Sequence, residues 1–86
     1  MTPAETDEAA RKAFGRAIVI RRAVLGLTRK QLAARAQLSY PYVSEIEVGS
    51  KEPSMKAFRH IADALEMSVV ELHLMHQKVG DGQFHF

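Results

Sequence analysis

Apolar residues recur at spacings of three and four along most of the chain, a pattern typical of amphipathic helices. The first such stretch runs to about Leu25 and places Phe14 and Ile18 on one apolar stripe. Ile20 and Val24 widen this surface beyond a single stripe, which predicts a second packing partner for the helix. No stretch shows the alternation of a half-buried strand, so the pattern predicts an all-α protein.

Polar residues before each apolar stretch and glycines after it divide the chain into five helices. Serine, threonine and aspartate cap helix N-termini, and they precede the five stretches at Thr2 or Asp7, Thr28, Ser39, Ser54 and Ser68. Glycine readily takes the left-handed conformation that ends helices, and it follows three of them at Gly26, Gly49 and Gly80. We therefore expect one domain over residues 1–80, a compact five-helix bundle, and a flexible tail over residues 81–86.

The stretch 28–47 predicts two short helices joined by a tight turn. A capping box, Thr28 with Gln31 three residues later, begins the first helix, and Ser39 caps the second. The positions expected to face inward are Leu32, Ala33, Ala36, Leu38, Val43 and Ile46. Helices this short are not stable alone, so the rest of the chain must hold them. The outward residues of the second helix are then left to contact another molecule.

The distribution of charge narrows the class of protein. Residues 11–35 contain no acid and eight basic residues, namely Arg11, Lys12, Arg16, Arg21, Arg22, Arg29, Lys30 and Arg35. Such asymmetry favours a polyanionic partner, although the formal net charge is only +2. An ordinary solvated helix surface is the alternative explanation.

Composition excludes several other classes. The chain has no cysteine, no secretory signal and no apolar stretch of transmembrane length, so we expect a cytoplasmic protein that contacts no membrane. His73 and His76 have helical spacing, and His60 and His85 could join them, but no cysteine or carboxylate at fixed spacing completes a metal site. We expect packed or solvated histidines and no metal. No phosphate-binding loop or nucleophile motif indicates an enzyme, a cofactor or a small-molecule substrate.

Four segments of the chain carry motifs in a familiar order. They read FGRAIVIRR, GLTRKQLAARAQLS, VSEIEVGSKEPS and FRHIADALEMSVVEL, and they cover most of residues 14–72. In order and spacing they resemble the Xre family of bacterial and phage DNA-binding domains, which includes Cro and cI-type repressors. The resemblance implies a lambda-repressor-like bundle with a helix-turn-helix in its second and third helices. The third helix would enter the major groove of double-stranded DNA, and the second would lie across the backbone.

The resemblance also assigns expected roles to individual residues. Those facing the bases would be Tyr40, Pro41, Ser44 and Glu45. Glu45 could accept from a cytosine amino group, and Tyr40 could meet a thymine methyl or a phosphate. Those contacting phosphates would be Thr28, Arg29, Ser39, Ser50 and Lys51. Arg22 and Glu47 stand where the family has a buried ion pair, and loss of one partner should cost about 3–5 kcal/mol.

Three positions differ from the usual family pattern. Arg29 replaces a glutamine, so it can donate to a phosphate but cannot accept a hydrogen bond. Gln37 replaces the glycine of the turn, so either it is left-handed at a cost of about 1 kcal/mol or the turn has another shape. Arg21 replaces an apolar residue, which predicts a rotated or locally wetter first helix.

The helix expected over residues 69–79 is apolar on more than one face, through Val69, Val70, Leu72, Leu74, Met75 and Val79. One face should close the bundle. The surplus, together with Ile20 and Val24, would form the interface of a homodimer. Met55, Met67 and Met75 are expected to fill gaps in the core.

These observations predict a sequence-specific transcriptional regulator that binds double-stranded DNA. We expect a nucleoid-associated repressor that acts as a homodimer on a palindromic operator. The alternative is a protein-interaction module or antitoxin with the same fold. This alternative is suggested by the Tyr-Pro-Tyr run at residues 40–42 and by the modest net charge. It stays open because a fold alone does not decide function.

Overall fold

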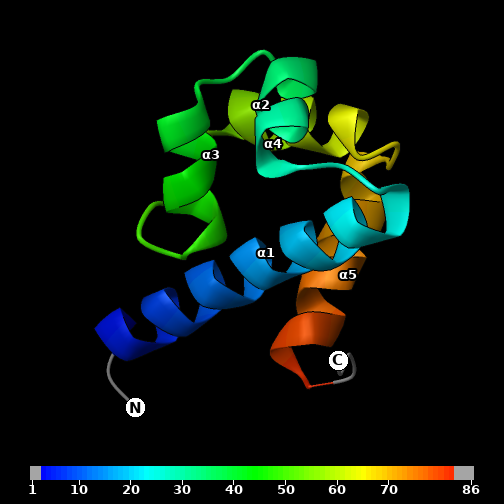
Figure 1. The fold of residues 1–86 in the computed structure, drawn as a ribbon. Coiled ribbons are helices and arrows are strands. Elements are labelled where there is room, and N and C mark those ends of the chain that lie inside the picture. Colours follow the sequence, from blue (N-terminus) through cyan, green and yellow to red (C-terminus); the bar gives the residue numbers. More distant parts are fainter. Residues whose placement is uncertain (1–2, 83–86) are drawn as a thin grey trace.

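The computed structural model describes residues 3–82, with side chains from residue 7 onward. Its five helices follow in the order α1 (Pro3–Leu25), α2 (Arg29–Ala36), α3 (Tyr40–Glu47), α4 (Met55–Ala64) and α5 (Val69–Gly80) (Figure 1). No strand occurs in residues 3–82, so the prediction of an all-α, five-helix fold is confirmed. None of the helices described is both long enough and apolar enough to span a bilayer.

The predicted capping residues begin the helices. In the box at α2, the Thr28 hydroxyl accepts from the Gln31 backbone N–H at 3.0 Å, and the Gln31 side chain accepts from the Thr28 N–H at 2.9 Å. An equivalent box of Ser68 and Glu71 begins α5, and single serine caps begin α3 and α4. The expected cap at Thr2 lies outside the described residues. Because α1 already begins at Pro3, the alternative start at Asp7 is wrong.

The helix ends agree with the sequence at two glycines and differ at the third. Gly26 and Gly49 have φ values of +70° and +83°, in the left-handed region expected of helix-ending glycines. Gly80 is instead the last residue of α5, because the N–H of Asp81 still bonds to the Gln77 carbonyl and the left-handed residue is Gly82.

The main core lies between α1, α2, α3, α4 and the start of α5. Its largest fully buried side chains are Ile18, Leu32, Val43, Ile46, Ile61, Leu65 and Leu72. A smaller cluster joins α1 to α5 through Ala17, Ile20, Met75 and Val79. The second packing partner that the wide apolar surface of α1 predicts is therefore α5.

Two apolar residues are not where the sequence placed them. Ile20 is only 7% exposed, because it packs within the smaller cluster, so it is not part of a free dimer surface. Met55 is 71% exposed at the first position of α4, where it does not fill the core. Met67 and Met75 do pack against the core clusters, as expected.

Contacts from α1 fix the position of α3. Gly15 faces the last turn of α3 so closely that a Cβ atom there would lie 2.6 Å from the Ile46 carbonyl oxygen and nearer still to that of Glu47. The Arg11 Nε donates to the Gly49 carbonyl at 3.1 Å and secures the end of the same helix. Helix α3 therefore rests on α1 backbone to backbone.

Arg21 has a defined structural role. Its Nε donates to the Leu65 carbonyl at 3.0 Å, so the guanidinium caps the C-terminal end of α4, where a cation is favoured. A polar residue in a usually apolar position is thus accounted for by a bond to a helix end, and the side chain is half-buried.

Candidate nucleic-acid interface

The turn between α2 and α3 has the left-handed residue that the family pattern requires, although that residue is a glutamine. Gln37 has φ 58° and ψ 39°, and its backbone N–H bonds to carbonyls of the last turn of α2. The Leu38 N–H then donates to the Ala33 carbonyl at 3.0 Å. Of the two alternatives that the sequence left open, the strained left-handed turn is therefore correct.

The outer side of α3 presents the four expected base-facing residues. Tyr40 is 49% exposed, Pro41 is exposed, and Ser44 and Glu45 are partly exposed. Val48 continues this surface as the C-cap residue of α3, four positions after Ser44, and is 58% exposed. Val48 was not among the outward residues that the sequence predicted for this helix. Its helical spacing from Ser44 and Pro41 was the signal that could have included it.

Tyr42 does not share this outer surface. Its side chain packs against the main core, and its hydroxyl accepts from the Ser54 backbone N–H at 3.1 Å. The Lys51 ammonium lies 5.7 Å from the centre of its ring. Tyr42 therefore joins α3 to the start of α4, and the Tyr-Pro-Tyr run does not form one exposed face.

A buried carboxylate joins the first three helices. Glu47, whose side chain is fully buried, accepts from the Arg22 Nε at 2.9 Å and the Arg22 Nη2 at 3.0 Å. The Arg29 Nε donates to the same carboxylate at 3.0 Å. The pairing that the resemblance implies is thus present, and α2 contributes a second arginine that the sequence reading did not assign to it.

Arg29 also reaches the exposed side of α3. Its Nη1 donates to the Ser44 hydroxyl oxygen at 2.9 Å. The Glu47 carboxylate, with smaller contributions from the Tyr40 hydroxyl, raises the pKa of the Arg29 guanidinium above its ordinary value. Arg29 therefore stays charged and lies among Glu47, Ser44 and Tyr40.

The expected phosphate-binding residues lie at the two ends of α3 and at the start of α2. Thr28, Arg29, Lys30 and Tyr40 line a shallow hollow of about 470 Å³ at the N-terminus of α2. Ser39 caps α3 by accepting from the Tyr42 N–H. Beyond α3, the Ser50 hydroxyl donates to the Glu45 carbonyl at 3.1 Å, and the Lys51 ammonium pairs with the Glu45 carboxylate at 3.1 Å.

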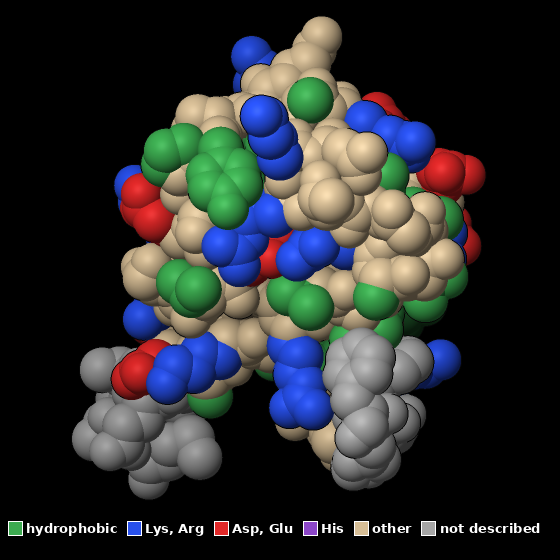
Figure 2. Space-filling view, in the orientation of Figure 1, with side chains coloured by type: hydrophobic (Ala, Val, Ile, Leu, Met, Phe, Trp, Pro, Cys, Tyr) green, Lys and Arg blue, Asp and Glu red, His purple; other side chains and the backbone are tan. Residues whose placement is uncertain are grey.

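The face of the molecule drawn in Figure 2 carries Lys and Arg side chains across its middle, interspersed with hydrophobic groups. Most of the acidic side chains visible in this view lie towards its edges. Such a surface has the electrostatic character expected of a phosphate-contacting face.

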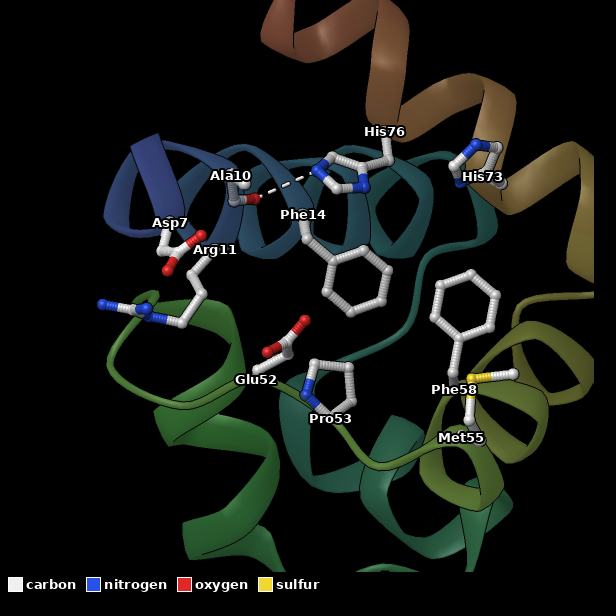
Figure 3. Close-up of a pocket in the computed structure, with 10 residues that line it drawn as sticks. All are labelled: Asp7, Ala10, Arg11, Phe14, Glu52, Pro53, Met55, Phe58, His73 and His76. Carbon is white, nitrogen blue, oxygen red and sulfur yellow. Dashed lines mark hydrogen bonds between the residues drawn. The ribbon is translucent and has the colours of Figure 1, made fainter. Parts of the chain in front are cut away.

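A separate cavity of about 380 Å³ lies between α1, α4, α5 and the loop before α4. Figure 3 shows the rings of Phe14 and Phe58 facing this space, with His76 directed to the Ala10 carbonyl oxygen. The histidines have structural contacts here: His76 bonds to Ala10 at 3.0 Å, and its ring meets that of Phe14 edge-on. Within the described part of the chain, no three potential ligands gather to hold a metal, and His85 lies outside that part.

The comparisons with known proteins agree with this geometry. A helix-turn-helix family profile matches residues 20–72. ClgR, the clp gene regulator of Corynebacterium glutamicum, is 32% identical with a TM-score of 0.79, covering 86% of this chain and 79% of its own. The restriction-modification controller protein C.AhdI of Aeromonas hydrophila is 29% identical with a TM-score of 0.70, covering 72% and 94%. The controller C.Esp1396I is 28% identical with a TM-score of 0.75, covering 81% and 91%.

The chain belongs to the Xre/Cro-like helix-turn-helix family, and it is a DNA-binding transcriptional regulator. The resemblance that the sequence motifs indicated is thereby confirmed. No curated protein matches the chain by sequence.

Proposed function

We propose that the protein is a repressor that binds a palindromic operator as a homodimer, with α3 of each copy in the major groove. The observation that carries this proposal is the exposed outer surface of α3 beside the N-terminus of α2. An α-helix fits the major groove, where each base pair presents a distinct pattern of donors and acceptors. Two copies related by a twofold axis would read the two half-sites of a palindrome.

The proposed base-reading residues are Tyr40, Pro41, Ser44 and Glu45. Tyr40 and Pro41 offer apolar contact to a thymine methyl, and the Glu45 carboxylate offers an acceptor to a cytosine amino group. The ion pair of Glu45 with Lys51 is half-exposed, so it is worth at most about 1 kcal/mol and can be exchanged for contacts to DNA. Exchange would release the Lys51 ammonium for a phosphate.

The proposed phosphate-binding residues are Thr28, Arg29, Ser39, Ser50 and Lys51. Three of them lie at the N-termini of α2 and α3, where backbone N–H groups and the helix dipole favour an anion. Ser50 and Lys51 lie beyond the other end of α3. Contacts at both ends of the helix would fix its register on the duplex without reading sequence.

We propose that the dimer forms through the outer side of α5. Val70 is 66% exposed and Leu74, one turn later, is 48% exposed. Val24 near the end of α1 is also exposed and can contribute, whereas Ile20 cannot because it is buried within the monomer. A symmetric interface uses the same patch on both copies, so one apolar face is sufficient.

Selection of duplexes from a random pool tests the operator. We expect an enriched motif with two inverted half-sites and an affinity that falls steeply as salt rises, because phosphate contacts release counterions. Replacing Glu45 with glutamine should change the preferred sequence, whereas Lys51→Ala should weaken binding to all duplexes alike. A protein that selects no motif, and instead captures a stoichiometric protein partner, would favour the protein-interaction alternative.

Sedimentation of the protein tests the dimer separately. The wild-type chain should sediment as a dimer, and Leu74→Glu should shift it to a monomer with the same helical content. A Leu74→Glu protein that remains dimeric would place the interface elsewhere.

A further inference from the structure

The cavity between α1, α4, α5 and the loop before α4 has the size and the lining of a small-molecule site. Its volume of about 380 Å³ lies within the range of about 300–1,000 Å³ that is typical of ligand pockets. The rings of Phe14 and Phe58, which line it, stack with their centres 5.3 Å apart. Met55 also lines the cavity and is 71% exposed. An apolar body that enters the cavity would contact both rings and cover the flexible Met55 side chain.

The charged side chains of the cavity leave a negative charge available inside it. They are two carboxylates, Asp7 and Glu52, and one guanidinium, Arg11. Among the ion pairs of residues 7–82, none involves Asp7 or Glu52. The Arg11 Nε already donates to the Gly49 carbonyl at 3.1 Å. Figure 3 shows the Arg11 guanidinium directed away from the phenylalanine rings, whereas the Glu52 side chain rises from the loop towards the space that the rings face.

We propose that this cavity binds a small organic amine that is protonated at neutral pH and has an aromatic or aliphatic body. The body packs on Phe14, Phe58 and Met55, and the ammonium group pairs with the Glu52 carboxylate. The faces of aromatic rings also attract cations. A ligand with its own carboxylate would be repelled by Asp7 and Glu52, and a neutral ligand would gain only the apolar contacts.

The proposed amine site is separate from the outer surface of α3. None of the proposed base-reading residues lines the cavity. The site borders the loop that follows α3, because Glu52 comes directly after Lys51 in the chain. Amine binding can therefore be measured on the free protein, and its success or failure is independent of the proposed operator binding.

Titration with phenethylamine, followed through the methionine methyl resonances, tests the site. The Met55 methyl resonance should shift to saturation, whereas that of Met67, which does not line the cavity, should not. Phenethyl alcohol and phenylpropionate have the same aromatic body but carry a neutral and a negative group. Phenethylamine should bind about 3- to 10-fold more tightly than the alcohol, the range of one hydrogen bond, and more tightly still than the acid.

Three variants locate the binding groups. Glu52→Gln should weaken phenethylamine binding by about 3- to 10-fold and leave binding of the alcohol unchanged. Glu66→Gln is the matched control, since it removes an exposed carboxylate outside the cavity and should leave binding unchanged. Ala10→Leu fills part of the cavity from an exposed position of α1, so it should abolish binding although Glu52 remains. Thermal unfolding checks that each variant is folded.

The remaining outcomes would overturn the proposal. Tighter binding of phenylpropionate would show that Arg11 and not Glu52 sets the charge preference of the cavity. Equal binding of the amine and the alcohol would leave an apolar cavity with no preference for a cation. Equal losses in Glu52→Gln and Glu66→Gln would show a general attraction of the amine to the protein's negative charges. A Met55 resonance that does not shift at millimolar phenethylamine would show that the cavity is no amine site.

Discussion

Helix α1 contacts α3 and α5 in opposite ways. Against α3 it presents Gly15, with no side chain, and Arg22, which pairs with the buried Glu47. Against α5 it presents Ala17 and Ile20, which pack with apolar side chains only. The first junction is polar and directional, whereas the second is mainly apolar and has one side-chain hydrogen bond, between the His76 ring and the Ala10 carbonyl oxygen at 3.0 Å.

The difference fits the role that we propose for α3, which is to read base edges. Hydrophobic burial depends on the area removed from water and tolerates small shifts, whereas hydrogen bonds to a carboxylate weaken steeply outside a narrow range of distance and angle. A recognition helix must be held within a small range of angles for its side chains to meet base edges. A helix that closes the core needs only to cover it, so the polar junction belongs at α3.

Glu47→Gln should have the largest effect. It changes almost no side-chain volume, so the effect reports the loss of the charge. The amide nitrogen would face a guanidinium, and one of two partly buried arginines would lose its partner. We expect a loss of about 3–5 kcal/mol in the free energy of unfolding, measured by chemical denaturation. A loss below about 1 kcal/mol would show that the α1–α3 junction does not depend on its charges.

Gly15→Ala tests the close backbone contact of the same junction. The added Cβ meets carbonyl oxygens of α3 that cannot yield without moving that helix, so we expect a loss of about 1–3 kcal/mol. Gly80→Ala is the matched control, because its Cβ would lie 3.8 Å from that of Ala13, an ordinary contact. The control should be neutral or slightly stabilising, since alanine is the better helix former. Equal destabilisation of the two variants would contradict the comparison.

Met75→Leu tests the apolar junction with a change as conservative as Glu47→Gln. Leucine has a similar volume and no directional bond is lost, so the cost should stay below about 1.5 kcal/mol. DNA binding should be unchanged at temperatures where the protein is folded. If Met75→Leu cost as much as Glu47→Gln, the α1–α5 junction would be as specific as the α1–α3 junction.

The smallest effect concerns pH and the start of α5. The backbone N–H and hydroxyl of Ser68 lower the pKa of the Glu71 carboxyl below its ordinary value of 4.5. Because the folded pKa is the lower one, this contact stabilises the fold above pH 4.5 and is lost as pH falls through the folded pKa. Glu71→Gln keeps the capping box but not the titration. Denaturation below pH 4.5 should therefore show a smaller loss of stability in the variant than in wild type.

The helix starts could be predicted because their bonds are local. Thr28 and Gln31, or Ser68 and Glu71, are three residues apart, so the sequence alone brings the bonding groups together. The Arg22–Glu47 pair spans 25 positions, and no spacing rule connects such residues. We expected the Arg22–Glu47 pair only because of the family resemblance. Arg29 stands where the family usually has glutamine, so neither spacing nor the resemblance predicted its contact with Ser44.

The sequence also did not predict which apolar residues at the edge of the core are buried. Ile20 and Val24 lie four residues apart on α1 and look alike in the pattern, yet one is 7% and the other 68% exposed. The difference is that Met75 and Val79 of α5 pack in the cluster with Ile20 and not with Val24. Val48 was missed for a related reason, because it lies between Glu47, the last residue of α3, and Gly49, where the sequence does not show that it continues the outer surface of the helix.

The sequence by itself determined where the helices of the bundle begin, which residues form its centre, and which face of α3 is left outside. These features depend on contacts within three or four residues and on hydrophobic periodicity, and both are present in the amino-acid sequence itself. The tertiary structure alone decided which way Arg29 points, how closely Gly15 lets α3 approach α1, and which apolar residues of α1 meet α5. Those outcomes depend on how whole helices cross, and that geometry arises only when all five pack together.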